Sequence, residues 1–383
     1  MEPQIIYDKF LGLFNKVPIL VRSPGRINLI GEHTDYNEGL VLPAAIDKEI
    51  VLTVAPADSN NCKVYAADYK QLFEFKLDKI QKSNKSWQNY FLGVLNELGN
   101  REINIQPFNC VFGGDIPIGG GLSSSAALTC GFAYALNELF DLKLSKLDLV
   151  QIGHQAENNF VGLQCGIMDQ FANIFGRKDH VLKLDCRSLE YELIPFGFSD
   201  VSLLLLDTQI SHDLASSEYN LRRQQCEAGV AEIRKIDNSV MSLRDVSREL
   251  LRETKPRLHP VIFKRCDYVV REIERVAQAC EALKQNELNK FGELMFKTHA
   301  GLRDDYEVSC PELDFLFDAA SSDSAVIGAR LMGGGFGGCN INLVHENSSD
   351  EFASQIQKQY HSKFGRVLKI YSVKIKSGSS KLL

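Results

Sequence analysis

A loop rich in glycine and serine, at residues 113–127, constrains the fold more than any other feature of this chain. It follows an apolar stretch typical of a strand, and a helix is expected directly after it, from Ala126 to Phe140. Three consecutive glycines, Gly119 to Gly121, allow backbone N–H groups to converge where the helix presents its positive end. This geometry suits the binding of a phosphate chain.

The loop matches neither of the two common nucleotide-binding fingerprints. It is not Gly-x-x-x-x-Gly-Lys-Ser/Thr, which excludes a Walker A loop, and Leu122 and Ser124 break the spacing Gly-x-Gly-x-x-Gly. The three hydroxyls of Ser123 to Ser125 offer donors to phosphate oxygens and a neutral ligand for magnesium. The alternative is that these serines only cap the helix after a turn.

A second group of polar side chains lies near the start of the chain, between Ser23 and Tyr36. Glu32, His33 and Asp35 offer donors and acceptors at short range, as a protein needs to bind several hydroxyls of a small polyol. We interpret this segment as a binding site. The alternative is a solvated loop with an incidental cluster of charges.

Another glycine-rich stretch, Gly333 to Gly338, lies more than two hundred residues after the first. It precedes an apolar strand expected at Ile341 to Val344. Each loop alone is explained by a plain turn, but together they suggest two backbone surfaces that close around one polar ligand.

Length and charge limit the classes of protein that fit. A chain of 383 residues exceeds the usual size of one core, so two domains are expected, 1–200 and 201–383, with a soft boundary. The net charge of −6, with no long basic tract, argues against nucleic acid or an anionic membrane as the main partner. The longest aliphatic stretch, Val201 to Leu206, is too short to span a bilayer. No obligate protein partner is indicated.

The ten cysteines are scattered and form no Cys-x-x-Cys pair. They indicate a reduced protein of the cytoplasm and argue against a zinc site. Hydrophobic periodicity predicts two further helices, one from Ser145 to Gly162 and one from Phe263 to Gln285. Strands are expected near 19–22, 40–55, 109–116, 181–185 and 201–207.

Taken in order, these stretches resemble the three motifs of the GHMP small-molecule kinases, at Pro24 to Tyr36, Gly119 to Ala127 and Gly333 to Gly338. Residues 31–39 match the signature Gly-Glu-His-Thr-Asp-Tyr-Asn-x-Gly of the galactokinase family within that group. The stretches 165–171 and 212–223 are similar to galactokinases as well. Asn340 departs from the family, in which many relatives have Thr.

The resemblance implies a two-domain α/β (α+β) fold. Its N-terminal domain would resemble domain 2 of ribosomal protein S5, its C-terminal domain would be ferredoxin-like, and the ligands would bind in the cleft between them. The implied activity is transfer of phosphate from ATP to the anomeric hydroxyl of galactose, the first committed step of galactose catabolism. An N-acetylgalactosamine kinase, or a non-catalytic regulator that binds galactose and ATP, is the alternative.

The resemblance also implies the residues of the site. Sugar binding falls to Arg26, Glu32, His33, Thr34, Asp35, Gly166, Asp169 and Tyr219. Nucleotide binding falls to Trp87, Tyr90, Gly119, Gly120, Gly121, Leu122, Ser123, Ser124 and Ser125. Magnesium would be held by Ser125 and Glu157. Trp87 is alternatively a core residue, and Glu157 alternatively forms a surface pair with His154.

Asp169 and Arg26 are the implied catalytic residues, the aspartate as base and the arginine as its partner. A buried Asp beside an Arg has a lowered pKa and is a weak base in the ground state. Phosphoryl transfer depends mainly on alignment and neutralisation of charge, so the proton can move late. We therefore expect Asp169 to orient the hydroxyl and take its proton during transfer. A purely electrostatic role for both residues, or a salt bridge that only holds the cleft together, is the alternative.

Overall fold

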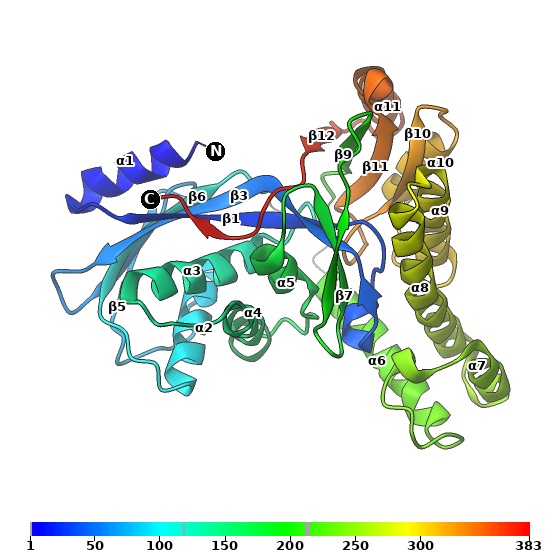
Figure 1. The fold of residues 1–383 in the computed structure, drawn as a ribbon, viewed down its shortest axis with the longest axis horizontal. Helices are drawn as coiled ribbons and strands as arrows, with labels where there is room; N and C mark the ends of the chain where they lie inside the picture. Colours follow the sequence, from blue (N-terminus) through cyan, green and yellow to red (C-terminus); the bar gives the residue numbers. More distant parts are fainter. Residues whose placement is uncertain (1, 118, 211–214) are drawn as a thin grey trace.

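A computed structural model describes residues 2–117, 119–210 and 215–383, with the side chains of 215–217 left aside. The molecule is elongated, with a six-stranded sheet at one end and a four-stranded sheet with several helices at the other (Figure 1). A three-stranded sheet lies between them. No helix among the described residues is long and apolar enough to cross a membrane.

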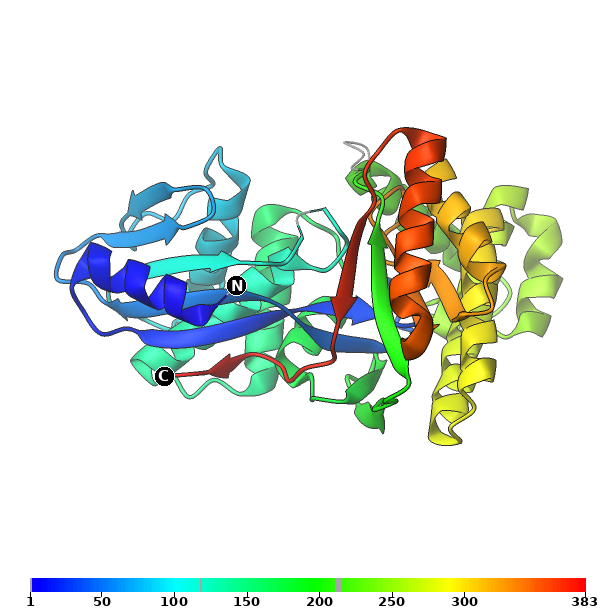
Figure 2. The same ribbon diagram turned by 90° about the horizontal axis from the view of Figure 1, so that it is seen from above.

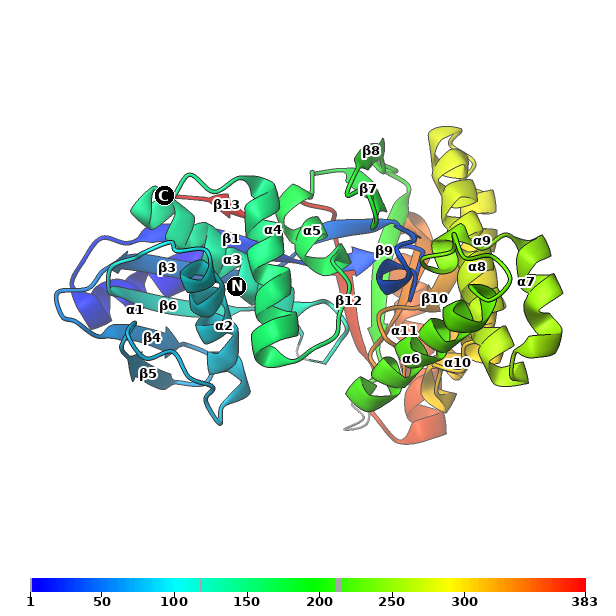
Figure 3. The ribbon, with the colours of Figure 1, turned by 90° about the horizontal axis from the view of Figure 1, so that it is seen from below.

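The six-stranded sheet has the order β13-β1-β3-β6-β4-β5. Its strands are β1 (Ile19–Asn28), β3 (Pro43–Pro56), β4 (Cys62–Ala66), β5 (Gln71–Phe75), β6 (Phe108–Gly114) and β13 (Ser380–Lys381). Helix α1 (Pro3–Phe14) covers one face, and the other face carries a layer of four helices (Figures 1 and 3). These are α2 (Ser86–Asn100), α3 (Ser124–Phe140), α4 (Lys146–Gln155) and α5 (Met168–Phe175). Both faces of β1 and β3 are therefore buried.

The four-stranded sheet is antiparallel, with the order β10-β11-β9-β12. It comprises β9 (Val201–Asp207), β10 (Val326–Leu331), β11 (Cys339–His345) and β12 (Lys369–Val373). The helices of this half are α6 (Ala215–Ile233), α7 (Arg248–Thr254), α8 (Pro260–Lys284), α9 (Leu288–Asp304), α10 (Pro311–Ser321) and α11 (Ser349–Phe364). The small sheet between the halves pairs β2 (Leu40–Val41) with β7 (His180–Asp185) and β8 (Tyr191–Pro195).

Local signals explain several boundaries. The capping box of Ser145 and Asp148 begins α4, as expected, because each residue bonds the backbone N–H of the other. The helix predicted to reach Gly162 is present, but its second half is not α-helical. There the chain forms a π-helical segment, η2 (Ala156–Val161), which Gly162 ends with a φ of 97°. Helix α8 matches the predicted helix from Phe263 to Gln285 within three residues.

The single strand expected over 40–55 is also wrong. Two strands stand there, β2 in the small sheet and β3 in the large one. The backbone N–H of Leu42, between them, donates to the side-chain oxygen of Asn28 at 3.2 Å and to the carbonyl of Ile30 at 3.1 Å. Because the N–H of Leu42 is bonded to Asn28 and Ile30, it is not available to pair with a neighbouring strand of either sheet. The strand is therefore interrupted at Leu42.

The chain enters the second half at β9, directly after the boundary expected at residue 200, but it later returns. Strand β13 pairs with β1, with Lys381 opposite Val21 (Figure 2). The main apolar core is continuous across the two halves, since Val276, Phe291 and Ile341 belong to the same cluster as Leu29.

Candidate active site

Two glycine-rich loops meet at the centre of the molecule. The first glycine loop (residues 115–123) joins β6 to α3, and the second glycine loop (residues 332–338) joins β10 to β11. A β-carbon on Gly333 would lie 3.7 Å from the Cα atom of Gly121, so the loops are in contact. Gly121 and Gly333 both have a positive φ, which permits this close approach. The two glycine-rich motifs, far apart in the sequence, thus lie together in space.

Arg26 and Asp169 form an ion pair beside these loops. Arg26 lies on β1, just after a register shift, and Asp169 lies in the first turn of α5. The Nε and Nη2 atoms of Arg26 donate to the two carboxylate oxygens of Asp169 at 2.6 and 2.7 Å. The hydroxyl of Ser123 also donates to Asp169, and the Nη1 atom of Arg26 donates to the carbonyl of Gly121. Burial lowers the pKa of Arg26, but the Asp169 carboxylate more than offsets this and raises it.

This pair lines a cavity of about 460 Å³. The wall of the cavity comes from both halves of the molecule and includes Ser125 and Glu157. Its remaining lining residues are Glu32, His33, Asp35, Val161, Gly162, Leu163, Gln164, Cys165, Gly166, Met168, Tyr219, Asn220, Gly333, Gly334 and Gly335. The charged and polar groups gathered here suit a small ligand with several hydroxyls.

The loop after β1, which we call the β1–β2 loop (residues 29–39), supplies three of the polar groups. His33 has a positive φ, its Nδ1 atom lies 2.8 Å from the hydroxyl of Tyr36, and its Nε2 atom lies 3.3 Å from the carbonyl of Gly334. Burial lowers the pKa of His33 to about 3, so the ring is neutral at pH 7. The carboxylate of Glu32 is almost fully buried.

Thr34 does not face the cavity, unlike His33 and Asp35. Its hydroxyl donates to the carbonyls of Gly31 and Leu40 at 2.9 and 2.7 Å, and the residue lines neither this cavity nor the second one described below. These bonds fix the turn of the β1–β2 loop.

The carboxylate of Asp35 packs against Gly166, which has no side chain. A β-carbon on Gly166 would lie 2.0 Å from an oxygen of Asp35, so the carboxylate occupies the space that any other residue would fill. Burial, together with the charge of Asp169, raises the pKa of Asp35 to about 7. Tyr219 of α6 closes the cavity from the other side, where its ring packs against that of His33. Residues 212–214 of the same motif lie outside the described residues.

A second cavity, of about 320 Å³, adjoins the first. Ser125 lines both cavities, so they meet at the start of α3. Trp87 and Tyr90 of α2 line the second cavity, as does Ser124. The indole ring of Trp87 also packs against Phe112, yet its N–H has no hydrogen-bond partner among the described residues. Trp87 is therefore both a core residue and a wall of the cavity.

Residues 119–123 of the first glycine loop line neither cavity. Leu122 is buried in the core, and Ser123 bonds Asp169. Ser123 precedes α3 with a positive φ and its side chain makes no capping bond, so this serine does not cap the helix. Gly119 and Gly120 lie beside the second glycine loop, within 4 Å of a β-carbon placed on Gly338.

Ser125 and Glu157 offer oxygen ligands to a cation. Burial raises the pKa of Glu157 to about 7, and its carboxylate accepts from Gln170 at 2.8 Å and from Thr129 at 3.2 Å. No cluster of three His, Cys, Asp or Glu side chains suited to a metal occurs among the described residues. A magnesium ion needs no such cluster, because it binds one or two protein oxygens and completes its shell with phosphates and water. The two residues therefore fit magnesium.

Sequence reasoning missed several residues of the site. Gln170 lies within the stretch 165–171, but its place in the sequence indicates no role, and nothing in the sequence points to Arg330, described below. Asp68, Tyr69 and Ser86 line the second cavity without belonging to any motif. Contacts between distant segments bring them there, and a local pattern does not record such contacts.

Three family models match the chain. The galactokinase galactose-binding signature matches residues 8–56, the GHMP kinases N terminal domain matches 89–177, and the GHMP kinases C terminal domain matches 270–362. The galactokinase of Thermosipho africanus is 42% identical over 362 residues, which cover 94% of this chain and 99% of that protein. The galactokinase of Thermotoga maritima is 40% identical over the same shares of each chain.

Solved structures indicate the same family as the sequence relatives. The chain superimposes on Lactococcus lactis galactokinase complexed with galactose with a TM-score of 0.95, at 35% identity over 99% of both chains. The mevalonate kinase of Methanococcus jannaschii matches with a TM-score of 0.66 at 21% identity, over 94% of this chain and 99% of that one, which shows likeness of fold. The expected two-domain α/β fold of the GHMP kinases is confirmed. The chain belongs to the galactokinase family of GHMP kinases.

Proposed function

We propose that this chain transfers the terminal phosphoryl group of ATP to the anomeric hydroxyl of galactose, giving galactose 1-phosphate and ADP. The observation that carries the proposal is the Arg26–Asp169 pair, which lies in the wall of a cavity that also holds the polar groups of the β1–β2 loop. The likeness to a galactokinase that was solved with galactose supports this choice of substrate.

The sugar would bind in the first cavity and the adenine end of ATP in the second. The polar groups Glu32, His33 and Asp35 face the sugar cavity, and Trp87 and Tyr90 face the nucleotide cavity. Because Ser125 lines both, a phosphate chain that passes this residue reaches from one cavity into the other. Gly166 and Tyr219 would complete the sugar pocket, and Thr34 would act by fixing the loop.

Asp169 would orient the attacking hydroxyl and accept its proton. Its Oδ2 atom already accepts from Arg26 and Ser123, whereas Oδ1 accepts only from Arg26 among the described residues. Each carboxylate oxygen has two acceptor sites, so Oδ1 retains one for the sugar hydroxyl. The carboxylate would gain the proton late, as the hydroxyl oxygen bonds to phosphorus and loses basicity. Arg26 would stabilise the negative charge on the transferred group.

Magnesium would be held by Ser125 and Glu157 together with the phosphates. When bound, it neutralises charge on the phosphate oxygens. Thr129 and Gln170 hold the carboxylate of Glu157 in place from two sides.

We also propose that the protein works in the cytoplasm, because all ten cysteines are unpaired and most are buried. The two domains are proposed to meet near residue 200.

An ADP-release assay tests the proposed function across galactose, N-acetylgalactosamine, glucose, mevalonate and homoserine. We expect galactose to give the highest kcat/KM. Preference for N-acetylgalactosamine would reassign the substrate and leave the chemistry intact. Activity restricted to mevalonate or homoserine would overturn the sugar assignment, and absence of activity with all five would favour a regulator that binds galactose and ATP.

A further inference from the structure

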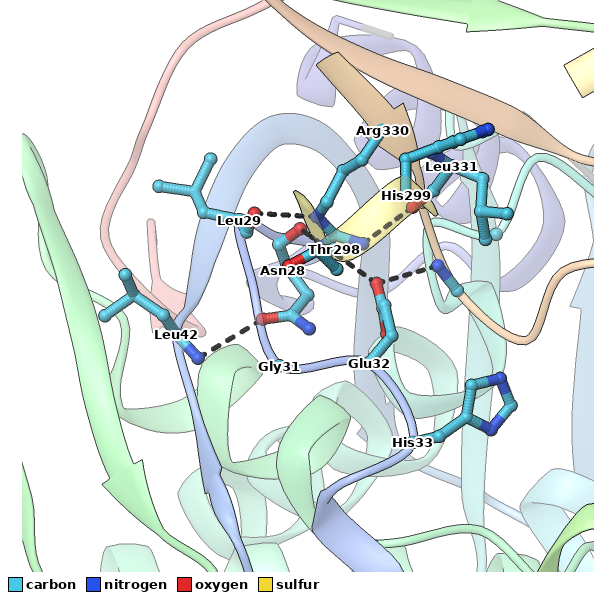
Figure 4. Close-up of polar contacts among 12 residues, drawn as sticks. Asn28, Leu29, Gly31, Glu32, His33, Leu42, Thr298, His299, Arg330 and Leu331 are labelled. Atoms are coloured by element: carbon cyan, nitrogen blue, oxygen red, sulfur yellow. Dashed lines mark hydrogen bonds and ion pairs between the residues drawn. The ribbon is translucent and has the colours of Figure 1, made fainter. Parts of the chain in front are cut away.

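Arg330 lies at the end of β10 and is fully buried, yet it contacts a loop of the other domain (Figure 4). Its Nε atom donates to the carbonyl of Leu29 at 2.7 Å, and its Nη2 atom donates to the carbonyl of Asn28 and to the Oε1 atom of Glu32, the latter at 2.9 Å. Its Nη1 atom donates to the carbonyl of Leu331. Three of these four bonds hold residues 28–32.

The carboxylate of Glu32 is fixed from a second direction. The backbone N–H of Gly333 donates to the same Oε1 atom at 2.9 Å. Arg330 and Gly333 stand three residues apart, so one strand end of the second domain supplies both donors. Oε1 is thereby occupied, and Oε2 is the oxygen of Glu32 that remains for a ligand in the cavity.

Two more groups of the second domain hold the backbone of the same loop. The N–H of Gly31 donates to the carboxylate of Glu272 at 2.9 Å, and the hydroxyl of Tyr268 donates to the carbonyl of Glu32 at 3.1 Å. Both residues belong to α8 and are fully buried. The loop that presents Glu32 and His33 to the cavity is thus bonded on one side to β10 and on the other to α8.

A buried guanidinium with this pattern of bonds has a specific physical effect. Its planar fork meets four acceptors at once, three of them in residues 28–32, which a lysine ammonium on a flexible stem does not reproduce. A loop that is already ordered loses little conformational entropy when its ligand binds, so the ligand binds more tightly. Arg330 lines neither cavity and therefore acts only through the groups it holds.

We infer that Arg330 is a positioning residue for the sugar, which orients Glu32 and fixes the β1–β2 loop before the sugar binds. This inference rests on the proposed function. It assigns to the second domain a part in sugar recognition besides the direct contact proposed for Tyr219. The charge of Arg330 compensates that of Glu32, and the shape of its side chain sets where the carboxylate points.

The test compares Arg330→Lys with the matched control Arg265→Lys. Arg265 is also a buried arginine of the second domain, but it bonds Asp305 and Glu307 and makes no bond to the β1–β2 loop. We expect Arg330→Lys to raise the galactose KM and the calorimetric galactose Kd at least about tenfold, the size of effect that loss of a charged hydrogen bond produces. The KM for ATP and kcat should stay within about threefold of the wild type, as should every constant of Arg265→Lys.

A double-variant cycle and an exchange measurement complete the test. Because Arg330 acts through Glu32, the effects of Arg330→Lys and Glu32→Gln on galactose affinity should be less than additive. Hydrogen exchange of the wild type should show slow exchange at residues 28–33 without galactose, and this measurement holds even when a variant does not fold. Fast exchange there that slows only on adding galactose would overturn the inference.

The remaining outcomes distinguish a failure of this inference from a failure of the proposed function. An unchanged galactose Kd in Arg330→Lys, with a melting temperature lowered as in Arg265→Lys, would show a merely structural arginine and overturn the inference alone. A wild type that releases no ADP and binds no galactose would overturn the proposed function. A wild type that binds galactose but does not phosphorylate it would remove the catalytic proposal, while the affinity measurements would still decide the role of Arg330.

Discussion

At the scale of single residues, the Arg26–Asp169 pair decides how the reaction proceeds. The bidentate bond with a buried arginine holds the carboxylate of Asp169 in one orientation, and phosphoryl transfer depends mainly on such alignment. The pair is well defined because each partner has a second bond, Arg26 to Gly121 and Asp169 to Ser123.

The variant Asp169→Asn tests the role as a base. An amide keeps the shape of the carboxylate but cannot take the proton, so we expect kcat to fall at least about a hundredfold, the lower end of the usual contribution of general base catalysis. Steady-state kinetics with galactose give kcat, and calorimetry gives the galactose Kd. Near-normal turnover would leave Asp169 an electrostatic role only. Arg26→Ala, measured in the same way, reports on the partner.

Asp35 should make the stability of the free protein depend on pH. Its pKa of about 7 in the folded state lies above the ordinary value of 3.8, so the folded protein keeps a proton that the unfolded chain releases. Stability from this group is therefore present at acid pH and lost as the pH rises through about 7. Between about pH 5 and pH 8, the wild type should lose roughly 1 to 3 kcal/mol relative to Asp35→Asn.

Urea denaturation of both proteins at the two pH values measures this difference. The Asn variant supplies the control, because every other titrating group is the same in both proteins. An equal pH dependence of the two free energies of unfolding would show that Asp35 is ionised throughout this range.

At the scale of elements, the segment between η2 and α5 shapes the sugar cavity. Residues 161–166 form one wall, and Gly166 packs against Asp35 so closely that a side chain has no room. Gly166→Ala should push the Asp35 carboxylate out of place and raise the galactose KM about tenfold or more, the effect expected when a positioned polar contact is lost. Steady-state kinetics with galactose and ATP check this.

Gly99→Ala is the matched control for that substitution. Gly99 lies in the last turn of α2, and a β-carbon there would meet nothing within 4 Å. We expect this variant to keep its kinetics and to gain stability of up to about 1 kcal/mol from the better helix propensity of alanine. Equal galactose KM values for the two variants would argue that Asp35 does not contact the sugar.

Elements with a strong local signal were predictable, and those set by distant contacts were not. The capping box at Ser145 correctly gave the start of α4, and the apolar stripe of α8 gave that helix. The π-helical turn at 156–161 follows no local pattern, and the break at Leu42 depends on a bond to Asn28. The motifs located the β1–β2 loop, whereas Arg330 comes from three hundred residues away and carries no signature.

At the scale of the whole molecule, the two cavities should report their ligands separately. Trp87 is the only tryptophan, and it lines the second cavity and not the first. Adding ATP without galactose should therefore change the intrinsic tryptophan fluorescence, and adding galactose alone should leave it nearly unchanged. A fluorescence titration with each ligand checks this assignment. A change with galactose alone would contradict it.

The path of the chain through the two halves limits how they can move. Since the chain leaves the small sheet after β8 and later returns as β13 beside β1, two covalent connections join the domains. A body attached at one point can swivel in any direction, but a body attached at two points turns mainly about the line between them. We therefore expect any opening that admits ATP or releases ADP to be a hinge rotation of one domain about the axis through the two connections.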